Sequence, residues 1–211
     1  MAKKKKRRVK LKKILTIILI LIAIIIFVHM LNNKKQPEAK EIEIIDTIDD
    51  FGYQLNDNET EYYKKLFNEL KDLLNQEDYN EEEYAQIISK LFLTDFYDLN
   101  SKIMKSDIGG TQFVYEPYQQ DFELGAKNSI YKYVESNIYG DRKQDLPIVK
   151  EVTVETITKD TFEYNNEIDY NAYYLTMNIS YNKNLGYPTN VELVLIHDND
   201  RLEIAKLETK I

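Results

Sequence analysis

The stretch Tyr173-Tyr-Leu-Thr-Met-Asn-Ile-Ser-Tyr181 decides the fold class of this chain, because apolar and more polar side chains alternate along it. Successive side chains of a β-strand point to opposite faces, so the alternation gathers the apolar side chains on one face. That face contains Tyr173, Leu175, Met177, Ile179 and Tyr181. One apolar face is typical of a strand in an antiparallel sheet that covers a core on one side only.

The sequence on both sides of this stretch repeats the pattern. Val149–Ile157 alternates before it, and Val191–His197 alternates after it. Asn165-Asn166 and Asp198-Asn199-Asp200 are typical of the tight turns that join antiparallel strands. The apolar positions slip in phase between Leu202 and Leu207, which predicts a β-bulge. We therefore predict a β-meander in the C-terminal part of the chain.

Two amphipathic helices are predicted before the meander. Asn58-Glu-Thr-Glu61 and Asn80-Glu-Glu-Glu83 each place an Asn three residues before a Glu, which is a helix-start signal. The first helix carries its apolar face at Tyr63, Leu66, Phe67, Leu70, Leu73 and Leu74. The second carries it at Tyr84, Ile87, Ile88, Leu91, Phe92, Phe96 and Leu99. Such faces must be buried against each other or against a sheet.

Gly109-Gly110 ends the second helical pattern, and two more elements are predicted after it. Thr111–Tyr115 is interpreted as a short strand, and Gln119–Asn137 as a third helix. Helices first and a meander last is the order of an α+β fold. We expect three helices packed on a curved antiparallel sheet.

The order helix, helix, short strand, helix and meander, which covers residues 58–211, resembles the nuclear transport factor 2-like fold. In that cone-shaped fold a strongly bent sheet wraps around a long helix and leaves a cavity. The resemblance rests on element order, and this chain has one strand between the second and third helices where that fold often has more. Glu41–Leu55, whose apolar residues alternate imperfectly, is additional and is expected to add an edge strand.

A membrane span is predicted at the N-terminus. Nine Lys and Arg residues lie within residues 1–13, and an apolar run of eighteen residues follows from Ile14 to Leu31. A helix of this length, at about 1.5 Å per residue, reaches about 27 Å, close to the thickness of the hydrocarbon core. Lys and Arg remain on the cytoplasmic side. We therefore predict a cytoplasmic tail at 1–13, a transmembrane helix at 14–31, a linker at 32–40 and an extracytoplasmic domain at 41–211.

Two other interpretations of the N-terminus are open. A cleaved signal peptide has the same order of basic and apolar residues, but its apolar part is usually about 7–15 residues long. The residues after the run, Val28–Lys35, contain no small-x-small cleavage site. Lys3–Arg8 also matches a nuclear-import or nucleic-acid patch. Beside an apolar run, membrane topology is the favoured interpretation.

The combined architecture has a resemblance of its own. A chain with a basic tail, one span and a cone domain is similar to the inner-membrane assembly factors of type IV secretion and conjugation machines.

The part of the chain after Leu31 is strongly acidic. It contains 19 of the 28 basic residues and all 36 acidic ones, a net charge of about −17. Such a surface repels nucleic acid, which we do not expect as a partner. The chain contains no Cys, which excludes disulfides, zinc-thiolate sites and thiol nucleophiles. Its high Ile, Asn, Lys and Tyr content without Trp indicates an AT-rich, bacterial genome.

Two polar residues are candidates for chemistry. Asp95 falls on or beside the buried face of the second helix, where a carboxyl group has a raised pKa and can act as a base. His197 is the one His outside the apolar run, and it shares a face with Val191 and Leu193. Each also has a structural interpretation. Asp95 lies at the edge of the apolar face, or accepts a hydrogen bond from a Tyr or a turn amide. His197 is a partly solvated residue at a strand end. The candidate pocket consists of Asp95, Tyr173, Leu175, Val191, Leu193 and His197.

With one exported His and no Cys, we expect neither a metal site nor a cofactor. The leading expectation is a non-catalytic interaction or scaffold module that docks envelope proteins or a second copy of itself. The alternative is a cone domain that binds a small ligand or a peptide. A third hypothesis, a cavity enzyme, requires Asp95 and His197 within hydrogen-bonding reach.

Overall fold

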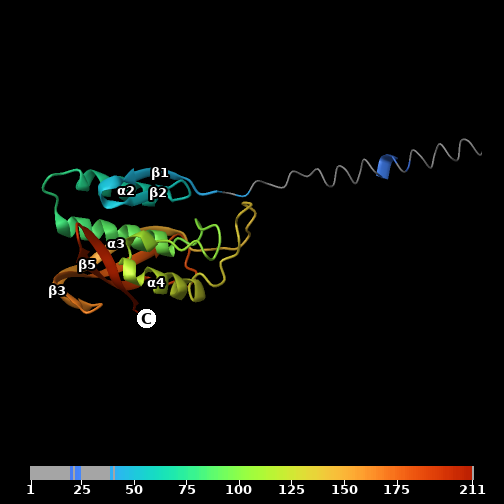
Figure 1. The fold of residues 1–211 in the computed structure, drawn as a ribbon. Coiled ribbons are helices and arrows are strands. Elements are labelled where there is room, and N and C mark those ends of the chain that lie inside the picture. Colours follow the sequence, from blue (N-terminus) through green and yellow to red (C-terminus); the bar gives the residue numbers. More distant parts are fainter. Residues whose placement is uncertain (1–19, 21, 25–38, 40, 211) are drawn as a thin grey trace, which may run out of the picture. The chain divides into compact units, whose positions relative to one another are not determined.

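The computed structural model describes residue 20, residues 22–24, residue 39 and residues 41–210 (Figure 1). The chain divides into two compact units, residues 1–38 and residues 39–211. The predicted tail, most of the predicted span and nearly all of the predicted linker lie outside the described residues. Among the residues described, the structure contains no helix that is long and apolar enough to cross a membrane.

The second unit contains a four-stranded antiparallel sheet, as the alternation predicts. Its strands are β3 (Val149–Tyr164), β4 (Glu167–Tyr181), β5 (Asn190–Asp198) and β6 (Arg201–Thr209), in the order β3-β4-β5-β6. Asn165 and Asn166 form the predicted turn with φ angles of 45° and 65°, a left-handed region that Asn tolerates. The predicted bulge is confirmed, because the pairing skips Ala205 between Ile204 and Lys206.

The two faces of the sheet cover different cores. The inner face carries the larger one, which includes Tyr173, Leu175, Met177, Ile179, Val191, Leu193 and Leu195. The outer face carries a small cluster of Tyr115, Ala172, Val194 and Ile196. The larger core continues into the helices, so the sheet has one covered face and one face that is mostly solvated.

The two predicted amphipathic helices are α2 (Glu61–Leu74) and α3 (Glu81–Tyr97). Asn80 caps α3 as predicted. The cap of α2 is Thr60 rather than Asn58, because the Thr60 hydroxyl accepts the bond from the first turn. Figure 1 shows α3 between α2 and the strands. A helix enclosed in this way buries side chains on nearly all sides, which a one-sided apolar stripe does not predict.

Two predicted elements between α3 and the sheet are corrected. Thr111–Tyr115 is not a regular strand: it contains a 3-10 turn, η2 (Thr111–Phe113), and one parallel bridge from Val114 to Ile204. The third helix, α4 (Glu116–Asn128), begins earlier and ends nine residues earlier than predicted. Its Pro at the first turn favours the early start. Ser129 leaves the helical conformation and bonds the carbonyl of Gly125, which ends the helix.

The segment before α2 forms a separate hairpin rather than an edge strand of the main sheet. Strands β1 (Ile44–Ile48) and β2 (Tyr53–Asn56) pair with each other around η1 (Asp49–Phe51). Gly52 adopts a φ of 68°, which allows the tight turn into β2. Tyr53 is fully buried and its hydroxyl bonds that of Tyr84 on α3, so the hairpin is attached to the main core.

Candidate functional site

The four apolar residues of the candidate pocket lie in the core and do not line an open cavity on the inner face. Tyr173, Leu175, Val191 and Leu193 are at most 2% exposed. They belong to the same core cluster as the buried side chains of α3. The inner face of the sheet is therefore filled by the helix at the place where a cone cavity was expected.

Asp95 and His197 lie at opposite ends of α3. Nε2 of His197 is 3.2 Å from Oε1 of Glu81, at the start of the helix. Asp95 comes fourteen residues later, which is about 21 Å along a helix. The two side chains therefore belong to separate polar clusters, and the base–orienter pair required by the enzyme hypothesis does not form.

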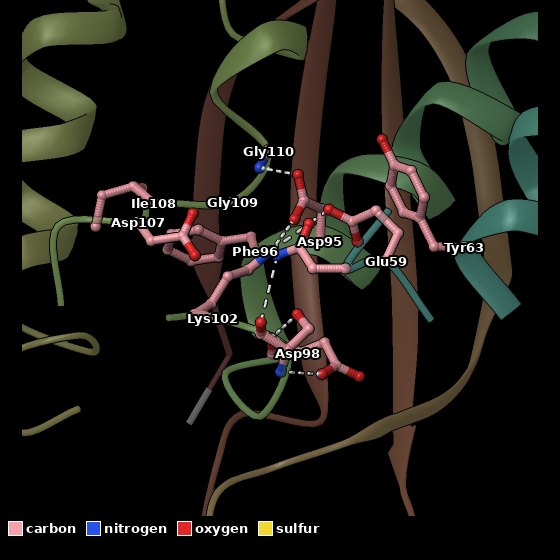
Figure 2. A network of polar contacts seen from close by, with 12 residues as sticks. Glu59, Tyr63, Asp95, Phe96, Asp98, Lys102, Asp107, Ile108, Gly109 and Gly110 are labelled. Atoms are coloured by element: carbon pink, nitrogen blue, oxygen red, sulfur yellow. Dashed lines mark hydrogen bonds and ion pairs between the residues drawn. The ribbon is translucent and has the colours of Figure 1, made fainter. Parts of the chain in front are cut away.

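The cluster at the C-terminal end of α3 is a buried ionic network (Figure 2). Lys102, whose side chain is 2% exposed, forms an ion pair with Asp95. Its Nζ also lies 3.8 Å from Oε1 of Glu59, which is likewise buried. The other carboxylate oxygen of Asp95 accepts the N–H of Gly110 at 2.6 Å. The structural interpretation of Asp95, a carboxylate that accepts a turn amide, is therefore confirmed, and an unpredicted Lys is added to it.

The charges in this network balance when Glu59 holds a proton. Burial, together with the nearby charge of Asp95, raises the pKa of Glu59 to about 8. Burial also disfavours the charged form of Lys102, but the negative charge of the facing Asp95 favours it, and the Lys102 pKa lies well above its usual value. One cation and one carboxylate then face each other in a water-poor site, which keeps the net charge near zero.

The same network attaches the loop after α3 to the C-terminal end of that helix. A Cβ atom on Gly109 would collide with the backbone carbonyl of Asp95. The hydroxyl of Tyr131 accepts the Gly109 N–H at 3.1 Å and donates to the carbonyl of Phe96 at 2.7 Å. Asp98, which Figure 2 shows beside the network, accepts the backbone N–H at the start of β3. The helix end, the loop and the sheet are therefore held by one set of polar contacts.

The cluster at the N-terminal end of α3 surrounds His197. Nδ1 of His197 lies 2.8 Å from Oδ2 of Asp169, and Nε2 faces Glu81. Glu81 also accepts from Lys159 at 2.9 Å and from the Tyr173 hydroxyl at 2.8 Å. Two predicted pocket residues, Tyr173 and His197, are therefore brought together, although by an unpredicted carboxylate.

This second cluster is more exposed than the first, although the side chain of its Asp169 is only 8% exposed. The side chains of Glu81 and Lys159 are 44% and 45% exposed. Burial opposes the ionised forms, but the hydrogen bonds from His197 and Lys159 outweigh it, so the pKa values of Asp169 and Glu81 lie below their usual range. Both ring nitrogens of His197 are engaged by carboxylates. Among the described residues, no group of His, Asp and Glu is arranged to hold a metal ion.

Two hollows of the described part open onto the surface. The outer face of the sheet has one of about 240 Å³, lined by side chains such as Thr156, Thr176, Glu192 and Lys206. A mostly apolar groove of about 540 Å³ lies beside β6. Large apolar side chains also lie on the surface, and Tyr133 and Tyr170 are 75% and 70% exposed. These features suit contact with other molecules better than enclosure of a small one.

Comparison with protein-family models, curated proteins and solved structures finds no match to this chain.

Sequence reasoning missed Lys102, Glu59 and Glu81 as members of these clusters. Lys102 lies in a polar loop, where Lys is common, and its burial depends on contacts with segments more than forty residues earlier. Glu81 was identified only as part of a helix start. The sequence feature that indicated the first cluster was the position of Asp95 on the buried side of α3.

Proposed function

We propose that this chain is a single-pass protein of the cell membrane whose C-terminal domain is a non-catalytic interaction module on the extracytoplasmic side. The observation that carries the proposal is the sequence of the first 31 residues. Nine Lys and Arg residues precede an uninterrupted apolar run from Ile14 to Leu31. Positive charge on the cytoplasmic side of a span of this length sets the orientation.

The chemistry of the domain supports the interaction role. Its candidate acid–base residues are engaged in contacts that hold elements together: Asp95 binds Lys102 and the loop after α3, and His197 bridges two carboxylates. Its hollows are open, and several large apolar side chains lie on the surface. An exposed apolar or Tyr-rich surface without a distinctive cavity is what a docking module requires.

The charge of the domain is consistent with this position. A net charge of about −17 after Leu31 repels anionic lipid headgroups and other acidic surfaces. The domain therefore stands off the membrane, where its surfaces are accessible to partners. The negative electrostatic field of the domain favours the binding of basic segments of envelope proteins.

The first test is crosslinking of the full chain in its native membrane, followed by mass spectrometry of the captured proteins. We expect one or a few defined envelope proteins, or a second copy of the chain, in a stable ratio. Recovery of the uncrosslinked chain alone would contradict the interaction role.

The second test is topology. A C-terminal epitope should be digested by a protease that is added outside intact cells or spheroplasts, whereas an N-terminal epitope should be protected. A variant in which the basic residues of 1–13 are replaced by Gln is the matched control, and it should lose the fixed orientation. Protection of the C-terminal epitope in the unmodified chain would contradict an extracytoplasmic domain.

A further inference from the structure

Side chains from neighbouring elements bond two sheet edges of the domain, each at one residue. The Tyr62 hydroxyl accepts the N–H of Val152 and donates to its carbonyl, so it occupies the edge of β3 at that residue. The amide side chain of Gln112 does the same for Gln54 on β2, with distances of 2.9 and 3.0 Å. A free edge is a template for pairing with another strand, and these side chains take the place of such a strand.

In the C-terminal half of β6, no side chain of the described residues bonds the backbone groups of Leu207 or Thr209 in this way. The backbone N–H of Tyr115 donates to the carbonyl of Ile204 at the edge of β6, and β6 continues beyond that contact to Thr209. Lys210 donates its N–H to β5, so the alternate residues Leu207 and Thr209 turn their N–H and C=O groups away from β5. Within residues 41–210, these outward groups receive no hydrogen bond from another element.

An apolar groove of about 540 Å³ lies beside this free edge. Its walls come from β6, the end of α3, the turn after α4 and the loop between β4 and β5. The lining includes Phe96, Tyr97, Ile130, Tyr187, Leu207 and Thr209. Unpaired backbone groups and apolar surface therefore occur together, which is the combination that strand addition uses.

We propose that the C-terminal half of β6 pairs, antiparallel and centred on Leu207, with the same strand of a second copy of this chain. Pairing about a two-fold axis at Leu207 sets Lys206 of each copy opposite Glu208 of the other. The two Leu207 side chains lie opposite each other at the groove. The strand is therefore complementary to itself in charge and in apolar contact.

The orientation of the two copies agrees with anchoring in one membrane. A two-fold axis that relates antiparallel edge strands of one continuous sheet is perpendicular to that sheet. Both copies then keep α3, α2 and the β1–β2 hairpin on the same side of the eight-stranded sheet. Since β1 is the first element of the domain, the domain begins on that same side in each copy.

The membrane also supplies the concentration that pairing requires, so this inference rests on the proposed function. The net charge of about −17 on each exported part opposes association in dilute solution. Two copies confined to one membrane meet at a much higher effective concentration. Pairing is therefore expected in the membrane and weakened when the copies are diluted from it.

The test uses the absence of Cys from the natural chain. Two full-length variants with different tags, Lys206→Cys and Glu208→Cys, are expressed together in the native membrane and oxidised. Pairing about Leu207 places these two positions in a non-hydrogen-bonded pair with Cα atoms about 4.5 Å apart, within disulfide range. Both side chains are about half-exposed, so neither substitution disturbs the core.

Each variant expressed alone is the matched control. Two copies of Lys206→Cys place their Cα atoms about 8 Å apart in this register, beyond disulfide reach. We expect about tenfold more mixed dimer than dimer of either variant alone, since collisions alone would not distinguish them. Equal yields in all three samples, or no dimer in any, would overturn the proposal. Crosslinking through Thr176→Cys on the outer face instead would place pairing on the sheet face and also overturn it.

Charge reversal provides an independent test, with Leu207→Cys as the reporter. Lys206→Glu places a Glu of each copy opposite Glu208 of the other copy, so two pairs of like charges face each other. The crosslinked fraction should fall about threefold to tenfold. Adding Glu208→Lys restores the complementarity and should restore the yield. The same swap of Lys65 and Glu69, an exposed pair on α2, should change nothing.

Membrane fractionation of the same samples separates the two proposals. A chain that stays in the membrane without forming the mixed dimer contradicts pairing and leaves the anchor intact. A chain that alkaline carbonate releases contradicts the anchor. In that event the mixed-disulfide yield of the released chain at about 100 μM decides the pairing, with dimer supporting it and monomer overturning it.

Discussion

The two ends of α3 use the same kinds of side chain in opposite surroundings. At the C-terminal end, Lys102 and Asp95 are almost fully buried and fix a loop against the helix. At the N-terminal end, Glu81 on α3 and Lys159 on β3 are nearly half-exposed, and Glu81 also contacts His197 on β5. Exposed ion pairs contribute little to stability, whereas breaking a buried pair leaves an uncompensated charge. Burial, rather than the number of contacts, therefore decides which end the fold depends on.

The largest expected effect is at the buried end. Lys102→Met removes the cation that faces Asp95 and leaves this buried carboxylate with the Gly110 N–H but without a compensating charge, so unfolding should become easier by about 3–5 kcal/mol. Urea denaturation of the full chain in detergent, followed by circular dichroism, measures the change. Lys105→Met, at an exposed position three residues later, is the control and should shift the midpoint little. A small effect of Lys102→Met would show that the network is not essential.

The second prediction concerns pH at the buried end. The pKa of Glu59 is raised from 4.5 to about 8, so between these values the folded state holds a proton that the unfolded state has released. The free energy of unfolding should therefore fall as the pH rises through this window, by up to about 1.4 kcal/mol per pH unit. Glu59→Gln mimics the protonated form and should flatten the slope. A pH profile of stability that is identical in both proteins would contradict the raised pKa.

A third prediction tests the close approach of the loop to α3. Gly109→Ala places a Cβ against the Asp95 carbonyl and should cost about 1–3 kcal/mol through a forced backbone shift. Gly125→Ala has open space within α4 and should stabilise by up to about 1 kcal/mol. Thermal unfolding of the two variants side by side should move in opposite directions. Equal shifts would argue against the tight contact.

The smallest effect is expected at the exposed end. His197→Ala should cost no more than about 1 kcal/mol at neutral pH, because both carboxylates keep other partners. Glu81 is partly solvated and retains Lys159, and the less exposed Asp169 retains the backbone N–H groups of residues 171 and 197. The pKa values of Asp169 and Glu81 are lowered in the fold, so their contribution is full above the usual values of 3.8 and 4.5 and is lost as the pH falls below them. Acidification through these pKa values should therefore destabilise the contacts at the N-terminal end of α3. The C-terminal end should stay stable in the same pH range, because Glu59 is already protonated there. A loss of stability as large as that expected for Lys102→Met would contradict the conclusion that the fold depends mainly on the buried end of α3.

The sequence predicts the sheet well and the connections poorly. β4 and β5 place apolar side chains on the inner face at a period of two, and their positions were predicted together with the turns. A bulge was predicted between Leu202 and Leu207, and it lies at Ala205. The third helix was predicted too long, because apolar residues continue at helical spacing through Val134 while Ser129 leaves the helical conformation. Periodicity reports which side chains can share a face, and it does not report where the backbone turns.

The polar clusters show the same limit. Asp95 was identified because its position on α3 is fixed by local spacing. Its partner Lys102 and the neighbouring Glu59 are brought together by loops whose conformation depends on the whole fold. His197 was placed correctly on the inner face of β5, but its partner Glu81 lies 116 residues earlier in the chain. Local pattern predicts single members of such clusters and not their pairing.

The burial of α3 also has a consequence for how the chain reaches its folded state. The helix is complete by residue 97, but the strands that cover it begin at residue 149 and end at residue 209. A chain synthesised from its N-terminus therefore presents α3 before the strands of its sheet have been made. Contacts between such distant segments also form slowly, because their loops must close first. The interval in which the helix is uncovered is the time when this protein is most exposed to aggregation and to proteases.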